Sequence, residues 1–320
     1  MNNIKRHLLT LYTRTPLHVG SGTSVDVVDL PIMRERITGF PVIPSTSLKG
    51  VLLQHAREVF EDGAHSRANI IPLDAKILFG AADTIGEGSE KKQVSNAGCV
   101  QIMEAKLLAF PVRSLAGCFA WLTCPAVLER FQRDTGKKFV VPQPSKDQAV
   151  VTDDSSLTIP EQAQIVLEEY VLALAPKPIN AQTVVKALTP VCSDPLWVES
   201  VGKRLVVLND ENFQHFVATA TEVVARIKVA PASRTVDGEA LFYQENVPCE
   251  ALFYSVLTVL LPRRDTGEKD HAKALSGANA KLEQLFPDEK QPGKHPPILQ
   301  IGGDETTGHG LCETKREELQ

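Results

Sequence analysis

The chain has 320 residues, 43% of them hydrophobic, which is enough apolar material for one elaborated domain or two. It contains no apolar run of about 18 residues, the length that a membrane-spanning helix needs. Its polar, basic first residues do not resemble a signal peptide. Six cysteines without a C-x-x-C pair exclude a zinc site or a disulfide framework of ordinary spacing, and free thiols fit a reducing cytoplasm. We expect a cytoplasmic protein that folds as a single elaborated domain over residues 1–320.

The formal net charge of −5 argues against a protein that coats nucleic acid nonspecifically. The average hides an asymmetry, because residues 1–60 carry seven basic and only four acidic side chains, whereas the rest of the chain is acidic. A site for a polyanion should therefore be local and lie near the N-terminus.

The N-terminal part predicts a strand, a long loop and a helix. Residues 5–14 alternate apolar and polar side chains, as a strand does, and Pro16 ends the pattern. Residues 23–44 show no clean period and contain three prolines, so we expect a long functional loop there. Hydroxyl residues at 45–47 are suited to cap a helix that ends near Asp62-Gly63.

The middle of the chain predicts shorter elements separated by two insertions. Residues 63–98 are mixed, and their glycine- and charge-rich part at 86–95 is interpreted as mobile. Strands follow at 99–112, and Gly136 stops a short helix at 125–134. The polar segment 137–163 is the second expected insertion. Residues 165–174 predict a strand.

The last third predicts a helix capped by Asn209 or Asp210, with an apolar face that extends to Ile227. Asp237-Gly238 has turn chemistry, so we expect a hairpin between residues 227–235 and 239–245. Residues 251–261 are almost wholly apolar and predict a central buried strand.

The C-terminal part predicts an amphipathic helix over residues 269–286 and a strand at 298–301. The glycine-rich segment 302–310, a short strand and a charged tail follow. The order of strands and helices along the chain indicates an α+β fold of ferredoxin-like type.

The start of the helix near residue 45 is a candidate phosphate site. The first turn of a helix leaves N–H groups unpaired and carries partial positive charge. Lys49 lies there, although the helix dipole favours an acid, and a bound anion would explain a lysine. An ordinary capped helix with an exposed lysine is the alternative. No G-x-x-x-x-G-K-[ST] sequence occurs, which excludes a P-loop.

Two glycine-rich segments are candidates for close backbone approach to a ligand. In the first, Gly20 and Gly22 flank Ser21, and the neighbouring His18 could hydrogen-bond a phosphate, act as a general base or merely brace the loop. The second, residues 302–310, has four glycines and suits either a phosphate nest or a tight strand connection. Its candidate residues are Gly302, Gly303, Thr306, Thr307 and His309.

Two acids, Asp26 and Asp29, lie in the long loop beside Arg34 and Arg36. When RNA is cleaved by its own 2′-hydroxyl, a carboxylate can hold a divalent metal or help to move the proton. A loop aspartate is more commonly a turn former, so these residues alone leave the role open.

Seven segments together carry a family resemblance. They are residues 15–22 (TPLHVGSG), 27–36 (VVDLPIMRER), 39–44 (GFPVIP), 47–50 (SLKG), 240–243 (ALFY), 251–254 (ALFY) and 301–310 (IGGDETTGHG). They resemble the RAMP superfamily of CRISPR proteins, most closely the repeated backbone subunit of type III-B (Cmr) RNA-targeting complexes. The segment 27–36 separates this subunit from its relatives, whereas SLKG and the glycine-rich tail identify only the superfamily.

The resemblance implies a ferredoxin-like palm with inserted fingers and a β-hairpin thumb, for which residues 227–245 are the candidate. Copies of such a subunit stack as a filament along a guide RNA, together with other subunits of a type III effector complex. Each thumb interrupts the pairing of guide and target, and the single-stranded target RNA is cut there.

The resemblance also implies roles for residues. Asp29 matches the catalytic aspartate and would hold a divalent metal, Mg²⁺ or Mn²⁺, whereas the family pattern places no catalytic acid at Asp26. The residues that match its RNA-binding positions are His18, Gly20, Ser21, Gly22, Arg34, Arg36, Ser47 and Lys49, together with the five named in the second glycine-rich segment. Many relatives have glycine where this chain has Ser45-Thr46, which weakens the case for unusually close approach there.

Two alternatives stay open. One is a purely structural RNA-binding subunit of the same kind of complex. The other is a stand-alone RAMP endonuclease that matures guide RNA without a metal, with His18 as base.

Overall fold

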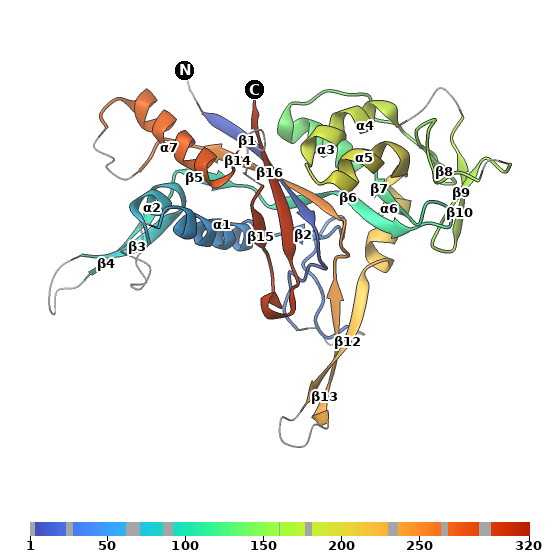
Figure 1. Ribbon diagram of the computed structural model, residues 1–320, viewed down its shortest axis with the longest axis horizontal. Coiled ribbons are helices and arrows are strands. Elements are labelled where there is room, and N and C mark those ends of the chain that lie inside the picture. Colours follow the sequence, from blue (N-terminus) through green and yellow to red (C-terminus); the bar gives the residue numbers. More distant parts are fainter. Residues whose placement is uncertain are drawn as a thin grey trace.

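The computed structural model describes residues 4–23, 28–61, 71–85, 92–159, 161–176, 181–229, 236–263, 268–287 and 296–320. Its centre is strand β1 (Lys5–Thr13), which lies antiparallel between β14 (Leu252–Val259) and β16 (Leu311–Leu319). Because Arg6 pairs with Leu319, the two ends of the chain lie side by side (Figure 1).

The sheet extends from this centre in both directions. Next to β14 come β6 (Ala105–Arg113), β7 (Phe119–Thr123) and β11 (Leu205–Val207), and next to β16 comes β15 (Ile298–Gln300). Two short strands join its side, with β2 (Val42–Ile43) paired to β6 and β5 (Val100–Ile102) paired to β14. Strand β11 runs parallel to β7, so the sheet is mixed.

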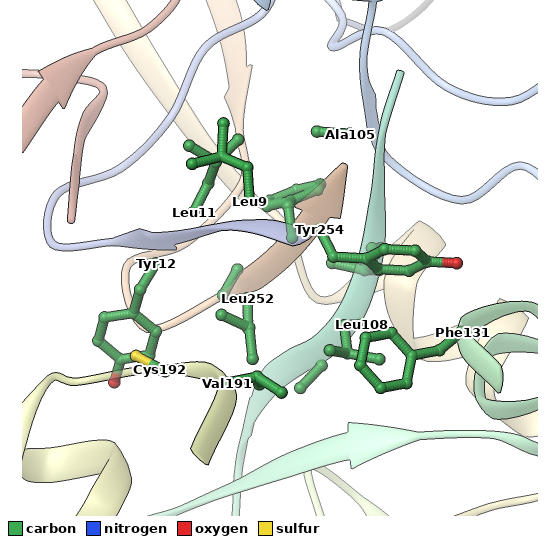
Figure 2. Packing of buried hydrophobic residues seen from close by; sticks show 14 of the residues in the cluster. Leu9, Leu11, Tyr12, Ala105, Leu108, Phe131, Val191, Cys192, Leu252 and Tyr254 are labelled. Atoms are coloured by element: carbon green, nitrogen blue, oxygen red, sulfur yellow. The ribbon is translucent and has the colours of Figure 1, made fainter. Parts of the chain in front are cut away.

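Both faces of β1 and β14 are covered, so nearly all of their residues are buried. Residues 7–13 of β1 are all buried. Leu9 and Leu11 point to one side of β1, and Tyr12 points to the other, toward Val191 and Cys192 (Figure 2).

Helices lie on the two sides of this core (Figure 1). On one side are α1 (Ser45–Val59), α2 (Leu73–Phe79) and α7 (His271–Leu285). On the other are α3 (Pro125–Thr135), α4 (Gln182–Leu188), a 3₁₀ turn (Thr189–Val191), α5 (Pro195–Arg204) and α6 (Asp210–Thr219).

Three smaller groups of strands lie outside the central sheet. Strands β3 (Gly80–Ile85) and β4 (Lys92–Ala97) pair with each other, and β8 (Gln148–Ala149), β10 (Tyr170–Leu174) and β9 (Gln164–Leu167) form a small sheet. Strands β12 (Glu222–Val229) and β13 (Val236–Asn246) form a hairpin that projects from the body (Figure 1).

The predicted α+β class, the strand near residue 5, the helices near residues 125 and 269 and the central strand near residue 251 are confirmed. The finer expectation of a ferredoxin-like order stays a prediction. The first predicted insertion contains α2, β3 and β4 in its described part, and residues 86–91 lie outside the described residues.

Several expected boundaries were wrong for identifiable reasons. Helix α6 ends at Thr219 instead of extending to Ile227, because the β-branched residues beyond it join β12. The strand expected at residues 165–174 is two strands, and the turn between them includes Glu168 at φ +48°. Asp237-Gly238 lies within β13, which begins at Val236, instead of forming the turn of the hairpin, and residues 230–235 lie outside the described residues.

Two further corrections concern the ends of elements. Pro44, not a hydroxyl residue, caps α1, and Ser45 is already helical. The charged tail is not a free end, because residues 311–319 form β16, which pairs with β1 along its whole length.

A buried polar cluster ties α7 to the sheet. Nε2 of His7 lies 2.6 Å from Oδ1 of Asn279, and Nη1 of Arg316 lies 2.9 Å from Nδ1 of His7. Because a guanidinium only donates, Nδ1 accepts and the proton of the neutral ring is on Nε2. Burial lowers the pKa of His7, and the charge of Arg316 lowers it further.

The cluster makes stability depend on pH. Since the pKa of His7 is lower in the folded than in the unfolded chain, the unfolded chain takes up the proton first as the pH falls below about 6.5. We expect the free energy of unfolding to fall there by up to about 1.4 kcal/mol per pH unit from this group. Urea unfolding of His7→Gln between pH 7 and 5 should show a shallower decline than the wild type. His271→Gln, at an exposed position of α7, is the control and should not flatten the decline.

Candidate nucleic-acid interface

The two glycine-rich segments, far apart in the chain, pack against each other backbone to backbone. The N–H of Gly303 donates to the carbonyl of His18 at 2.9 Å, and the N–H of Gly310 donates to that of Pro16 at 2.8 Å. A Cβ atom on Gly302 would lie 2.1 Å from the carbonyl oxygen of His18, and φ there is +83°. This glycine therefore serves close packing between the two segments, and the packing brings both predicted phosphate loops into one surface.

His18 is almost fully buried at the centre of this junction. Its Nδ1 lies 2.7 Å from the carbonyl oxygen of Glu245, which can only accept, so Nδ1 donates. A Cβ on Gly20 would lie 2.8 Å from Nε2 of His18, so the ring also fills the space that Gly20 leaves. Three roles were considered for His18, and these contacts support the one in which its ring braces the loop.

Asp29 lies at the foot of the projecting hairpin. Its Oδ2 accepts a hydrogen bond from the backbone N–H of Tyr243 at 2.7 Å. The N–H of Leu30 donates to the carbonyl of Tyr243, and the N–H of Glu245 donates to the carbonyl of Leu30, both at 3.0 Å. The loop thus pairs with the edge of β13, and this pairing holds the carboxylate of Asp29 at a defined position. Asp26 lies outside the described residues.

Glu245 is the residue that the sequence interpretation missed. Its buried carboxylate accepts from the N–H of Ile32 at 3.0 Å, from Oγ1 of Thr221 at 2.9 Å and from Nη2 of Arg34. These bonds join the loop that carries Asp29 to β13 and to Thr221, the residue before β12. The available signal was the polar stretch Gln244-Glu245-Asn246 between the apolar residues 240–243 and Val247.

The two predicted arginines differ in their surroundings. Nη1 of Arg34 donates to the carbonyls of Gly39 and Val217, both at 2.9 Å, and its Nη2 pairs with Glu245. Arg36 is exposed. The charge of Arg34 is therefore used within the fold, and that of Arg36 is presented at the surface.

The opposite face of the hairpin meets the second glycine-rich segment. Oδ2 of Asp304 accepts from Nε2 of Gln244 at 2.6 Å and pairs with Nη2 of Arg226 at 3.0 Å. Nδ1 of His309 lies 3.1 Å from Oγ1 of Thr307, and its Nε2 lies 3.5 Å from Arg226. Asp304 is thus paired with the hairpin, and its negative charge is compensated by Arg226. Thr306, Thr307 and Gly303 remain exposed.

The start of α1 has no side-chain cap and no acid in its first turn. Lys49 and Gly50 are exposed there, and Ser47 is half-buried. A Cβ on Gly50 would meet nothing within 4 Å, so packing does not explain a glycine inside this helix. The helix contacts β15, the strand that leads into the second glycine-rich segment.

Comparison with known proteins assigns the family. A model of the RAMP superfamily matches residues 10–313. The chain belongs to the RAMP superfamily. It is 35% identical over 322 residues to the CRISPR system Cmr endoribonuclease Cmr4 of Pyrococcus furiosus, covering 99% of this chain and 97% of that protein. It is 24% identical to the CRISPR system CMR subunit Cmr4 of Saccharolobus solfataricus, covering 94% of this chain and 93% of that one.

Solved structures agree with this assignment. The crystal structure of oligomeric Cmr4 from Pyrococcus furiosus matches with a TM-score of 0.70 at 30% identity, covering 99% of each chain. A chain of the cryo-EM structure of the type III-B Cmr-beta complex bound to cognate target RNA matches with a TM-score of 0.63. At 18% identity, over 98% of this chain and 97% of that one, it shows the shared fold alone.

Two kinds of feature are absent from the described part of the chain. None of its helices is long and apolar enough to cross a membrane. Likewise, no group of three or more histidine, cysteine, aspartate or glutamate side chains within it is arranged to hold a metal ion.

The junction of the glycine-rich segments should be sensitive to a single methyl group. We expect Gly302→Ala to lower the free energy of unfolding well beyond the roughly 1–2 kcal/mol cost of a left-handed alanine, because its Cβ would collide with the carbonyl of His18. Gly308→Ala is the matched control, since φ is +78° there and its Cβ would meet nothing within 4 Å. Urea unfolding of both variants measures the difference. Equal losses would show that the junction adapts easily.

Proposed function

We propose that this chain is the backbone subunit of a CRISPR effector complex, in which copies of it bind a guide RNA as a filament and cleave the paired target RNA at regular intervals. The observation that carries the proposal is the position of Asp29, which is anchored to the backbone of the projecting hairpin. The named activity of the Pyrococcus furiosus relative, an endoribonuclease of the Cmr system, supports it.

The guide RNA is held through its backbone. A subunit that accepts any guide sequence must contact phosphates and sugars instead of base edges. The glycine-rich surface around Gly20 and Gly303, the uncapped first turn of α1 and the exposed Lys49 offer N–H groups and one cation for this purpose. The exposed side chain of Arg36 can reach either RNA or a neighbouring copy, whereas Arg34 contributes by holding the loop.

The hairpin of β12 and β13 acts as the thumb. It projects from the body (Figure 1), and Asp29 accepts a hydrogen bond from Tyr243 in its second strand, so a strand of RNA that is bent around the hairpin passes the carboxylate. Exposed apolar side chains of Val223, Ile227 and Leu241 give it a surface against which bases can pack. The place where the hairpin interrupts guide–target pairing is then also the place where the target RNA is cut.

Cleavage uses the target's own 2′-hydroxyl. The 2′-oxygen attacks the adjacent phosphorus, the bond to the 5′-oxygen breaks, and the products carry a 2′,3′-cyclic phosphate and a 5′-hydroxyl. Asp29 serves either by accepting the proton of the 2′-hydroxyl or by orienting the phosphate through a cation. Its Oδ2 is fixed by Tyr243, and this bond aims the carboxylate.

A divalent cation, Mg²⁺ or Mn²⁺, fits this donor set. Mg²⁺ is commonly bound by one or two carboxylates together with substrate phosphates and water, so the single carboxylate of Asp29 suffices when RNA is present. Such a cation would neutralise charge on the phosphate that is attacked.

A non-catalytic subunit of the same kind of complex is the second candidate. The described contact of Asp29 is a backbone N–H group and not a second acid or base, which favours the non-catalytic role. It predicts that the wild-type complex binds target RNA without producing regularly spaced fragments. The stand-alone endonuclease with His18 as base is disfavoured, because His18 is buried and bonded to the hairpin.

The proposed role of Asp29 is tested with Asp29→Asn, which keeps an oxygen that can accept from the N–H of Tyr243. We expect target binding to be retained and the cleavage rate to fall at least about 100-fold. The assembled complex is incubated with labelled target RNA and Mg²⁺, and the fragments and their 2′,3′-cyclic ends are quantified. Asp29→Ala should lose cleavage equally.

Unchanged cutting by Asp29→Asn would remove this residue from the mechanism. If Asp29→Ala alone lost both binding and cutting, the role of the carboxylate would be to fix the loop to the hairpin.

The helix start is tested with Gly50→Ala. Because the added Cβ meets no protein atom, we expect the free energy of unfolding to rise by about 0.5–1 kcal/mol as the helix is stabilised. If RNA backbone approaches Gly50, affinity for guide RNA falls although the fold is more stable. Fluorescence anisotropy with labelled guide RNA and urea unfolding measure the two effects. Gln54→Ala, one turn further along, is the control, and equal RNA affinity for all three proteins would move the site elsewhere.

A further inference from the structure

A groove beside α6 is not used by the proposed RNA site. It consists of two adjoining hollows of about 460 and 340 Å³ that share Tyr170 and Phe216 in their lining. The exposed side chains of Tyr170 and Val171, on β10, form part of its wall. The ring of Tyr170 is held edge-on against His215 and Phe216, at centroid distances of 5.0 and 5.5 Å. The groove thus presents a fixed apolar and aromatic surface.

The charge of the groove is unsuitable for nucleic acid. Its lining carries four carboxylates, Asp147, Glu168, Glu169 and Glu211, against two cations, Lys146 and Arg113. Both cations are already paired, Lys146 with Glu211 at 3.2 Å and Arg113 with Glu168 at 2.7 Å. The excess of acid repels phosphate and favours a partner that offers an apolar side chain next to a cation.

This chain carries an apolar side chain next to a cation on its own surface. Residues 35–40 form a tight turn, called the knob here, whose tip carries Ile37 and Arg36. Ile37 is 93% exposed, the highest value among the large hydrophobic side chains described as exposed. An isoleucine side chain that is exposed to solvent in this way does not stabilise the isolated chain.

The knob is rigid, which distinguishes it from an ordinary surface loop. The N–H of Glu35 donates to the carbonyl of Phe40, and the N–H of Gly39 donates to that of Glu35, both at 2.8 Å. The carboxylate of Glu35 pairs with Arg130 at 2.8 Å, and Nε2 of Gln214 donates to the carbonyl of Thr38 at 2.9 Å. A tip ordered in advance loses little entropy when it is bound.

The knob and the groove lie on opposite flanks of one helix. The knob packs against α6 through Gln214 and through the ring of Phe213, whose centroid is 5.0 Å from that of Phe40. The groove is lined by Asn212, His215 and Phe216 of the same helix. At about 100° per residue these two sets point in opposite directions. One chain can therefore offer its knob to a second copy while its groove receives the knob of a third.

We propose that the knob of one copy docks in the groove of the next, with Ile37 against Tyr170 and Val171 and with Arg36 beside Glu169. Because knob and groove are different patches, the contact is head-to-tail and repeats along an open filament instead of closing as a dimer. The inference rests on the proposed filament of copies and names the surfaces that join them.

The test compares assembly of the full-length chain on a single-stranded RNA long enough for several subunits, measured by sedimentation velocity. We expect Ile37→Asp to lower the association constant between copies at least tenfold, and Arg36→Glu and Glu169→Lys each to lower it. The double variant Arg36→Glu/Glu169→Lys should recover most of the loss, because the charges are exchanged. Leu73→Asp, an exposed apolar residue on α2, is the control and should assemble as the wild type does.

Assembly by Ile37→Asp at the wild-type level, or a double variant no better than its parents, would overturn the proposal. Loss of RNA affinity in Arg36→Glu with assembly intact would assign Arg36 to RNA instead. Thermal unfolding checks that each variant is folded, and the exposed tip makes misfolding by Ile37→Asp unexpected. Failure of the wild-type complex to cut target RNA would refute the cleavage role alone, since the assembly result is read independently of cutting.

Discussion

The arrangement of the whole surface depends on one backbone contact, in which the carbonyls of Pro16 and His18 accept from the N–H groups of Gly310 and Gly303. No residue with a Cβ atom fits at Gly302 or Gly310. The Cβ would lie 2.1 Å from the carbonyl oxygen of His18 at the first position and 2.0 Å from that of Ile301 at the second. The contact is possible because β1 and β16 are paired and bring both segments out of the sheet together. Glycines that look like a ligand-binding signature in the sequence are thus first a condition of the fold. Their backbone approach also leaves little side-chain bulk around the surface that we assign to RNA.

A second constraint couples this surface to the hairpin. The carboxylate of Glu245 is buried and has three donors, from Ile32, Arg34 and Thr221, so its desolvation is compensated by hydrogen bonds. Removing such a partner leaves a buried charge unpaired, which is why a buried ion pair holds geometry more reliably than it adds stability. The loop cannot move away from the hairpin without breaking these bonds. Asp29 therefore keeps its position relative to the hairpin even if the hairpin changes its angle to the body.

Local signals in the sequence predicted local structure well. Asn209 caps α6 and Gly136 ends α3 in a left-handed conformation, and both were readable from residue type and spacing. The failures arose where strand pairing overrides propensity, as at Asp237-Gly238, which has turn chemistry but lies within β13. The same is true of the charged tail expected after a short C-terminal strand, because residues 312–319 all pair with β1. For the site, the family resemblance singled out Asp29 as a candidate, but its bond to Tyr243 and the role of Glu245 depend on contacts more than 200 positions apart, which no local pattern contains.

An acidic chain that is proposed to bind RNA needs its positive and negative charges to be separated on its surface, and the structure shows where they lie. Arg34 forms an ion pair with Glu245, and Arg226 forms one with Asp304, so few cations remain at the proposed RNA surface. RNA binding there would rely mainly on backbone N–H groups. Fewer ionic contacts mean a weaker dependence of affinity on salt and less binding to RNA that does not fit the surface. The excess of acid gathers elsewhere, for example around Tyr170, where it repels RNA and favours a protein partner. Net negative charge is then not an obstacle to RNA binding but a means of confining it to one surface.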